Sequence, residues 1–378
     1  MDFNLSEEQH MLDGTVRGFI AREYGFEKRR AIKGSPEGWS RAIWKQFADL
    51  GLLGIGIPES HGGLDAGPVA TMLVMNAFGA GLVLEPYLAS AVVAAALLRR
   101  AGDSAHSQDL LPAMAAGNTI VVLAHSEPQS RYDLSRVAAS AESRAGDYVL
   151  RGRKAVVTHA PTADVLIVSA RVAGNETDAA GISLFRVPRG TPGLVLEPYA
   201  NLDGQCAAEV LLQDVRVPAA ARLGPDGEAH AAIEHAHDAG LAAVCAEAVG
   251  AMKSLLDTTA EYLRTRRQFG QPIGRFQALQ HRAADMLIHY EQAKSMSFLA
   301  TMRCLEPDRD ERRRALSAAK VVVGRACRFV GQQAVQLHGG MGVTDEVSVS
   351  HYFKRLTAIE LAFGDADSHL DRFIETGS

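Results

Sequence analysis

The chain has 378 residues, enough for two or three domains with a substantial apolar core. Hydrophobic residues make up 47% of the chain and charged residues 22%, values that exclude a disordered, fibrous or disulfide-framed protein. The net charge of -5 is spread over interspersed acids and bases, which excludes a nucleic-acid-binding tail.

The cysteines and the N-terminus indicate the compartment. No two of the four cysteines have C-x-x-C spacing, so we expect neither a metal site nor a disulfide framework: Cys206, Cys245, Cys304 and Cys327. The first residues are acidic, where a signal peptide would be basic and then apolar. No apolar run approaches the roughly 20 residues of a membrane span. A cytoplasmic protein is therefore expected.

Residues 1–118 have helical periodicity and predict an N-terminal all-α domain. Ser6 is expected to cap a first helix that runs through Met11, Val16 and Phe19. Further helices are predicted at 39–53 and 80–98, with a loop at 56–63 that glycine and proline interrupt.

Residues 119–228 predict a middle β domain, because short β-rich runs alternate with turn residues. The expected strands cover 120–124, 148–151, 155–158, 165–172, 182–187 and 210–217. Turns are predicted at Gly146-Asp147 and at 190–193.

Residues 229–378 return to helical periodicity and predict a C-terminal α-helical bundle domain. One long helix of near 30 residues is expected to end close to Phe269, and two more are predicted at 276–304 and 312–337. The expected order of domains is therefore α, β, α.

The usual nucleotide and zinc signatures, G-x-G-x-x-G after a strand, the P-loop and H-E-x-x-H, are absent. Two other motifs have chemical meaning. In Arg266-Arg267-Gln268-Phe269-Gly270, a forked guanidinium suits a pyrophosphate and a flat ring suits an aromatic ligand. In the stretch from Gln336 to Gly342, three glycines let the backbone approach a large ligand. The alternatives are a surface arginine beside a core phenylalanine, and an ordinary helix C-cap.

These motifs, together with Phe276-Gln277, Ile57-Pro58-Glu59-Ser60-His61-Gly62-Gly63 and Asp214-Val215-Arg216-Val217-Pro218, closely resemble the acyl-CoA dehydrogenase family over nearly the whole chain. The resemblance implies an N-terminal helical domain, a middle β-barrel or sandwich domain and a C-terminal four-helix bundle. It also implies FAD as cofactor, α,β-desaturation of an acyl-CoA thioester, and an electron-transferring flavoprotein as electron acceptor.

The resemblance assigns two groups of FAD contacts. Within the chain's own pocket these are Ser126 and Thr158, although each hydroxyl could instead satisfy local backbone. The second group reaches across a subunit interface to the FAD of a neighbouring subunit and implies an oligomer: Arg266, Phe269, Gln277, Gln336, Gly339 and Gly340.

The family's catalytic glutamate is missing. Its usual position matches Phe363, and the alternative position on the long helix matches Gly240; neither residue can accept a proton. Three carboxylates could substitute for the missing base, with Asp365 the first candidate, then Glu360 and Asp238. Asp365 could equally be the N-cap of a final helix.

Other differences also fall in the chain's own pocket. Residues 129–133 replace a glycine-rich family loop, and Val156 replaces a tryptophan that covers the flavin. The residues donated to a neighbour are intact. This asymmetry predicts a hetero-oligomer, a tetramer or dimer of dimers, in which a second acyl-CoA dehydrogenase subunit is the partner. The C-terminal stretches are most similar to pimeloyl-CoA dehydrogenase small subunits.

Two other functions remain open at this point: a self-sufficient enzyme with Asp365 or Asp238 as base, and a non-catalytic subunit that only completes another FAD site. The sequence does not define the acyl group.

Overall fold

The computed structural model describes residues 5–101 and 105–376. The chain divides into two compact units, each made of segments that are distant in sequence. The helical unit contains residues 5–31, Pro68–Val83 and 241–376. The sheet unit contains Ile32–Gly67 and Leu84–Gly240.

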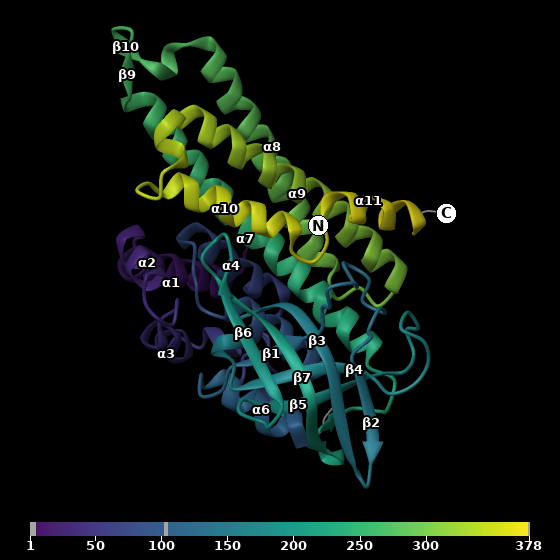
Figure 1. Ribbon diagram of the computed structural model, residues 1–378. Helices are drawn as coiled ribbons and strands as arrows, with labels where there is room; N and C mark the ends of the chain where they lie inside the picture. Colours follow the sequence, from purple (N-terminus) through teal and green to yellow (C-terminus); the bar gives the residue numbers. More distant parts are fainter. Residues whose placement is uncertain (1–4, 102–104, 377–378) are drawn as a thin grey trace. The chain divides into compact units, whose positions relative to one another are not determined.

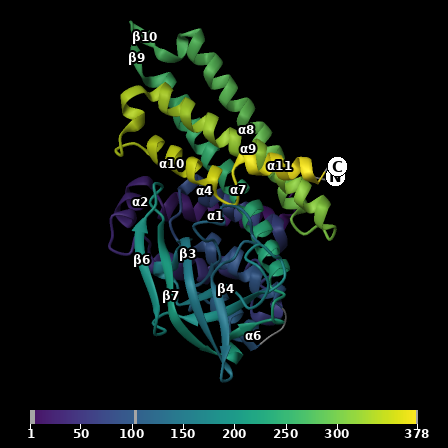
Figure 2. The same ribbon diagram turned by 45° about the vertical axis from the view of Figure 1, so that its right-hand side comes forward.

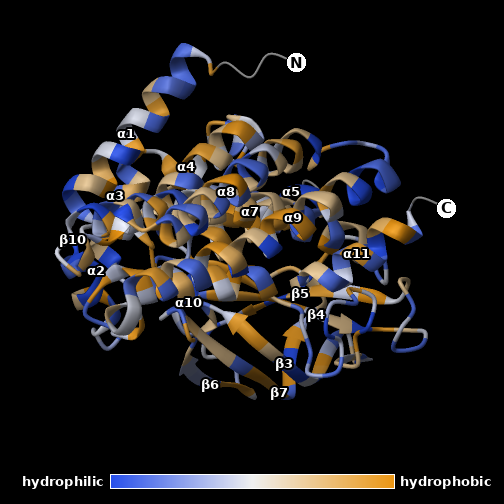
Figure 3. Ribbon diagram, turned by 90° about the horizontal axis from the view of Figure 1, so that it is seen from above, coloured by the Kyte–Doolittle hydropathy of each residue, from blue (hydrophilic) through white to orange (hydrophobic). Residues whose placement is uncertain are grey.

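The helical unit is built mainly of long helices. Its elements, some extending beyond the unit's limits, are α1 (Glu7–Glu23), α2 (Phe26–Lys33), α4 (Gly67–Gly81), α7 (His230–Thr265), β9 (Arg267–Gln268), β10 (Gln271–Pro272), α8 (Gln277–Arg303), α9 (Arg309–His338), η7 (Gly339–Val343), α10 (Ser348–Leu361) and α11 (Ala366–Glu375). As predicted, Ser6 caps α1, through a reciprocal pair of hydrogen bonds with Gln9. Figure 3 shows hydrophobic and hydrophilic residues alternating along these helices.

Two glycines let α4 and α7 approach each other closely. A Cβ atom at Gly79 would lie 1.9 Å from the carbonyl oxygen of Glu247, and one at Gly250 would lie 1.8 Å from that of Asn76. Since real Cβ atoms cannot come so near, only glycine permits this crossing. The Glu247 carboxylate then binds the buried Arg355 of α10 at 2.6 Å, so α7 is tied to two helices of the unit.

Helix α7 is also the one described helix long and apolar enough to cross a membrane. The sequence-based statement that no apolar run has this length was therefore too strong. Of the most apolar window of α7, 78% is buried inside the protein, as is usual for the core helix of a water-soluble fold.

The sheet unit is built on an eight-stranded mixed sheet (Figure 2). The path is β6-β7-β3-β2-β4-β5-β8, and β1 pairs with β4 in parallel. The strands are β1 (Val121–Ala124), β2 (Ser140–Arg144), β3 (Asp147–Thr158), β4 (Val165–Arg171), β5 (Ile182–Pro188), β6 (Leu194–Ala200), β7 (Cys206–Pro218) and β8 (Arg222–Leu223). The unit's helices are α3 (Arg41–Asp49), η1 (Leu52–Gly54), η2 (Glu59–His61), η3 (Leu88–Ala94), α5 (Ala95–Arg100), α6 (Ala105–Ala115), η4 (Ala160–Thr162) and η5 (Ala219–Ala221).

The expected fold class, with helical segments before and after a middle β domain, is confirmed (Figure 1). Two details differ. The strands expected at 148–151 and 155–158 are one continuous strand, β3, which passes through two irregularities instead of a turn. Strands β2 and β6 were not predicted: β2 is mostly exposed and polar, and β6 is mostly exposed, contains Pro198 and has no buried face. The boundaries at 118 and 228 remain predictions.

Candidate functional site

The Arg266 motif folds into a tight hairpin at the end of α7. Gln268 pairs with Gln271, so Phe269 and Gly270 form a two-residue loop, with φ angles of 50° and 80°. This is the geometry of a type I′ turn, which favours Asn-Gly and disfavours a bulky side chain in its first position. Phe269 is nevertheless there, 89% exposed and touching Phe276 edge-on. The hairpin thus holds an aromatic ring in water at a conformational cost.

The guanidinium of Arg266 is exposed and makes no hydrogen bond or ion pair with the described residues. Gln277, the first residue of α8, and Gln336, in the last turn of α9, are also exposed. The His338 ring stacks on Tyr262 with ring centroids 4.3 Å apart, which joins the end of α9 to the end of α7. The end of α7, which comes just before Arg266, therefore lies next to the end of α9, which contains Gln336.

Glycine at position 339 and glycine at position 340 have different structural explanations. Gly339 has φ 60° and ψ -140°, a conformation essentially closed to other residues. Gly340 has an ordinary φ, and a Cβ atom there would meet no described atom within 4 Å. Neither backbone conformation nor packing within the described chain requires glycine at 340. Its missing side chain leaves room for a group from outside the chain.

Ser126 and Thr158 lie on two segments of the sheet unit that a backbone hydrogen bond joins. The N–H of Ala155 donates to the carbonyl oxygen of Ser126 at 2.8 Å, which joins the segment after β1 to the end of β3. Ser126 is exposed and Thr158 half-buried. Neither hydroxyl makes a hydrogen bond with a described residue, so the alternative of local backbone satisfaction does not apply to them. Both hydroxyls are open to a ligand.

Glu127, which follows Ser126, and Lys154, on the same strand as Thr158, form a buried ion pair. The fully buried Nζ of Lys154 donates to Glu127 at 2.6 Å and to Ser169 at 3.0 Å, and Ser169 also contacts His125 at 2.9 Å. Burial lowers the pKa of Lys154, against the opposing effect of Glu127. Burial would raise the pKa of Glu127, but the Lys154 charge and the N–H donors of Ala138 and Ala139 together hold it below its usual value.

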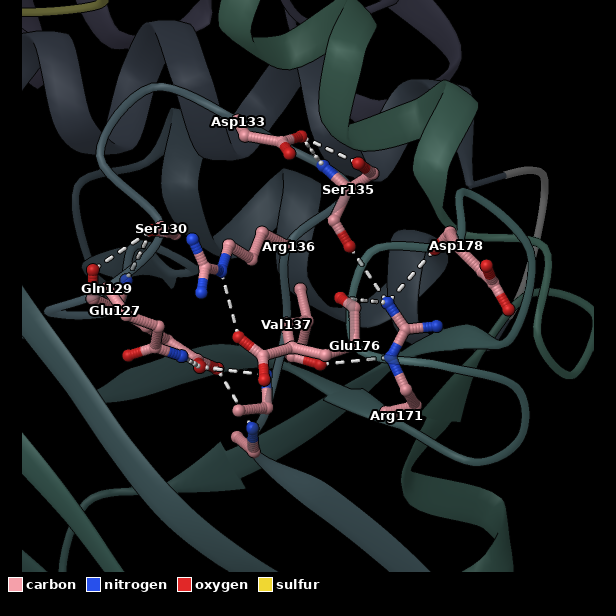
Figure 4. A network of polar contacts seen from close by, with 12 residues as sticks. Glu127, Gln129, Ser130, Asp133, Ser135, Arg136, Val137, Arg171, Glu176 and Asp178 are labelled. Atoms are coloured by element: carbon pink, nitrogen blue, oxygen red, sulfur yellow. Dashed lines mark hydrogen bonds and ion pairs between the residues drawn. The ribbon is translucent and has the colours of Figure 1, made fainter.

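Side-chain contacts hold residues 129–137, the segment that includes the expected replacement of a glycine-rich family loop (Figure 4). Ser130 accepts from the N–H of Glu127 and donates to its carbonyl oxygen, and Gln129 donates to the Glu127 carboxylate. The Arg171 guanidinium donates to the carbonyl oxygens of Ser135 and Val137 and to those of Glu176, Asp178 and Ala180. Without glycines, this loop depends on side-chain contacts for its shape.

Phe363, at the position where the sequence resemblance places the family's base, lies in the turn between α10 and α11. Phe363 adopts φ 60°, and its carbonyl oxygen contacts His369 at 2.8 Å. Asp365 caps α11 by accepting the N–H of Ser368 at 2.8 Å. Burial acts to raise the pKa of Asp365, but the bonds from Ser368 together with the charges of Lys320 and His369 keep it low. Its role as a base stays a prediction.

The other two carboxylates are buried. Glu360 lies 3.5 Å from the guanidinium of Arg328, and Asp238 lies near His237 at 3.8 Å. Among the residues described, no group of three or more His, Cys, Asp or Glu side chains could hold a metal ion. The four cysteines are not joined by disulfides.

Sequence reasoning missed two residues that support the segments with Ser126 and Thr158: Lys154 and Glu127. A signal was present for Lys154, which stands in a β-rich run where a charge is out of place. Its partner could not be read from the sequence, because the two residues meet only through strand pairing and loop closure.

Comparisons with known proteins agree with this architecture. The family models for the N-terminal, middle and C-terminal domains of acyl-CoA dehydrogenases match residues 6–118, 122–215 and 231–376. A similar protein, "Probable acyl-CoA dehydrogenase YngJ" of Bacillus subtilis, is 31% identical over 381 residues, covering 99% of this chain and 98% of the relative.

Two similar solved structures come from assemblies. One is a variant of the "Tcur3481-Tcur3483 steroid ACAD", with a TM-score of 0.87 and 29% identity, covering 98% of this chain and 97% of the other. The second is the "ChsE4-ChsE5 complex from Mycobacterium tuberculosis", with a TM-score of 0.87 and 28% identity, covering 99% and 98%.

The chain belongs to the acyl-CoA dehydrogenase family. Members of this family are FAD-dependent oxidoreductases, and this chain is accordingly an FAD-dependent enzyme. Its exposed Phe269, its open Gly340 and its two unbonded hydroxyls fit a large flavin nucleotide.

Proposed function

We propose that this chain desaturates an acyl-CoA thioester as one of two unlike subunits, with the partner supplying the carboxylate that this chain lacks. The observation that carries the proposal is an asymmetry. The residues that would reach a neighbour's FAD are exposed and open, while Phe363 and Gly240 stand at both expected positions of the base.

Bound FAD would accept the hydride from the β-carbon of the substrate. In the partner's site, Arg266 would bind the pyrophosphate as a forked cation, and Phe269 would cover an aromatic ring. Gln277, Gln336 and the backbone at Gly339 and Gly340 would complete this contact. In the chain's own pocket, Ser126 and Thr158 would bind the flavin ring, but no glutamate would remove the α-proton.

The two similar assemblies support this division of labour, because their names each join two differently named chains. One of them is described as a steroid enzyme, so a bulky acyl group is part of the proposal. Val156 in place of the larger family side chain agrees with more room in the pocket. An electron-transferring flavoprotein would reoxidise the FAD.

The test is co-expression of this chain with a second acyl-CoA dehydrogenase chain encoded beside it. The expected product is a yellow complex of both chains that bleaches its flavin with acyl-CoA. This chain expressed alone should be inactive. A yellow and active homo-oligomer would overturn the proposal and favour Asp365 or Asp238 as base.

Two matched variants test whether this chain contributes to FAD binding in the complex. Phe269→Ala should lower the FAD content of the complex without lowering the stability of this chain, because the ring is exposed. Met11→Ala removes another exposed side chain, 66% exposed on α1, and should leave the FAD content unchanged. A complex with no FAD and no turnover would indicate a non-catalytic scaffold subunit instead.

A further inference from the structure

The end of β3 contains a β-bulge next to the two proposed flavin contacts. Lys154 pairs with Val210 of β7, and Val157 pairs with Ala208, so Ala155 and Val156 together stand opposite the single residue Glu209. Such bulges redirect side chains and are frequent beside active sites. The bulge sets the direction of Val156 and of Thr158, two residues further on.

Glu209 accepts three hydrogen bonds around this bulge. One carboxylate oxygen, Oε1, accepts from the N–H of Val156 at 3.2 Å and from the hydroxyl of Tyr199 at 3.0 Å. The other oxygen, Oε2, accepts from Nε of Arg153 at 3.1 Å. Burial first, and then the Glu209 contact, raises the pKa of Tyr199 to about 12, so the phenol remains a donor at neutral pH.

This arrangement costs stability in two ways. Glu197 stands directly opposite Glu209 in the pairing of β6 with β7, and like charges in that position repel. Val156 has φ 51°, a left-handed conformation that β-branched residues rarely adopt, and its side chain is 57% exposed. Neither feature improves the packing of the sheet. Strain that the surroundings maintain in this way is typical of functional sites.

We propose that Glu209 is a positioning residue: its carboxylate fixes the Val156 bulge and so holds Thr158 where it meets the flavin. The proposal rests on the proposed flavin contact at Thr158. The remaining N–H of the bulge, that of Ala155, is bound by the carbonyl oxygen of Ser126. Glu209 and Ser126 thus fix the bulge from two sides, which couples both flavin contacts to one element.

The first measurement is amide hydrogen exchange at Val156 in the full chain without added FAD. Glu209→Leu should speed exchange at this amide roughly tenfold to a hundredfold, the range for loss of a hydrogen bond to a charged group. Glu209→Gln keeps the size and one acceptor oxygen, and should speed exchange only about threefold. Glu197→Gln, opposite Glu209 on β6, is the matched control and should leave Val156 exchange slow.

The second measurement is FAD affinity in the co-expressed complex. Glu209→Leu should weaken FAD binding about tenfold, the effect of losing one well-placed contact. Adding Val156→Gly to Glu209→Leu should restore part of the affinity, because glycine adopts φ 51° without strain. Urea denaturation of the same variants separates this recovery of FAD affinity from a general gain in stability, because glycine at φ 51° also relieves strain.

The outcomes separate this inference from the proposed function. Unchanged Val156 exchange in both Glu209 variants would overturn the positioning role, whatever the FAD result. A wild-type complex that binds no FAD would overturn the proposed function and the flavin part of this inference, while the exchange data would still decide whether Glu209 holds the bulge.

Discussion

The Nζ atom of Lys320 lies 2.6 Å from the carbonyl oxygen of Gly364 and donates a hydrogen bond to it. It donates a second bond to the carbonyl oxygen of Glu360 at 2.8 Å, from a side chain that is completely buried. Burial lowers the pKa of Lys320. The lysine of α9 therefore fastens the turn between α10 and α11, which contains Phe363.

Lys320→Met should destabilise the protein by about 1 to 3 kcal/mol, because methionine fills similar space but leaves two buried carbonyl oxygens without their donor. Urea denaturation measures the difference. Lys253→Met is the matched control: Lys253 is an exposed lysine of α7 paired with Asp257, and its loss should cost at most about 0.5 kcal/mol. Equal stability of the two variants would contradict a fastening role for Lys320.

Asp365→Asn separates the two roles considered for this residue. Asparagine caps helices about as well as aspartate, so stability should change by at most about 0.5 kcal/mol. If Asp365 is the base, flavin bleaching by acyl-CoA should stop. Under the two-subunit proposal, bleaching by the complex should continue. Asp365→Ala should cost about 1 kcal/mol through loss of the cap, which thermal unfolding would detect.

Thr158→Val should weaken FAD binding by about fivefold to tenfold while leaving stability nearly unchanged, because the hydroxyl has no partner in the described chain. Thr162→Val should show the opposite stability result. The Thr162 hydroxyl donates to the carbonyl oxygen of His159 at 2.9 Å, and its loss should cost about 1 kcal/mol. A large loss of stability in Thr158→Val would show that its hydroxyl is structural.

Glu127→Gln should destabilise the protein in a pH-dependent way. The pKa of Glu127 in the folded protein lies below its unfolded value, so its charge stabilises the fold above the unfolded pKa of about 4.3. That stability is lost as the pH falls through the folded pKa. At pH 7 we expect wild type to exceed the variant by about 3 kcal/mol, since breaking a buried pair strands Lys154.

Unfolding curves at several pH values test this expectation, and the difference between wild type and Glu127→Gln should shrink below about pH 4. Glu176→Gln removes an exposed carboxylate that pairs with Arg136, and it should change little at any pH. A difference that stays constant down to low pH would mean that the Glu127 charge is not responsible.

The helices and the family motifs could be predicted from the sequence because both depend on nearby residues. The cap at Ser6 and the helix after Phe276 follow from local pattern and were found where expected. The motif from Arg266 to Gly270 could also be found in the sequence. The backbone strain and the exposure of Phe269 could not be predicted, because φ angles and exposure depend on how the hairpin folds.

The sequence by itself determined the order of helical and strand segments, the family, the motifs that are expected to bind FAD, and the residue types at Phe363 and Gly240, since each is a matter of residue type and short spacing. Only the tertiary structure decided what supports them. Lys154 meets Glu127 across 27 residues, and Lys320 meets Gly364 across 44. Such contacts arise from strand register and helix packing, which bring distant residues together and which no local period encodes.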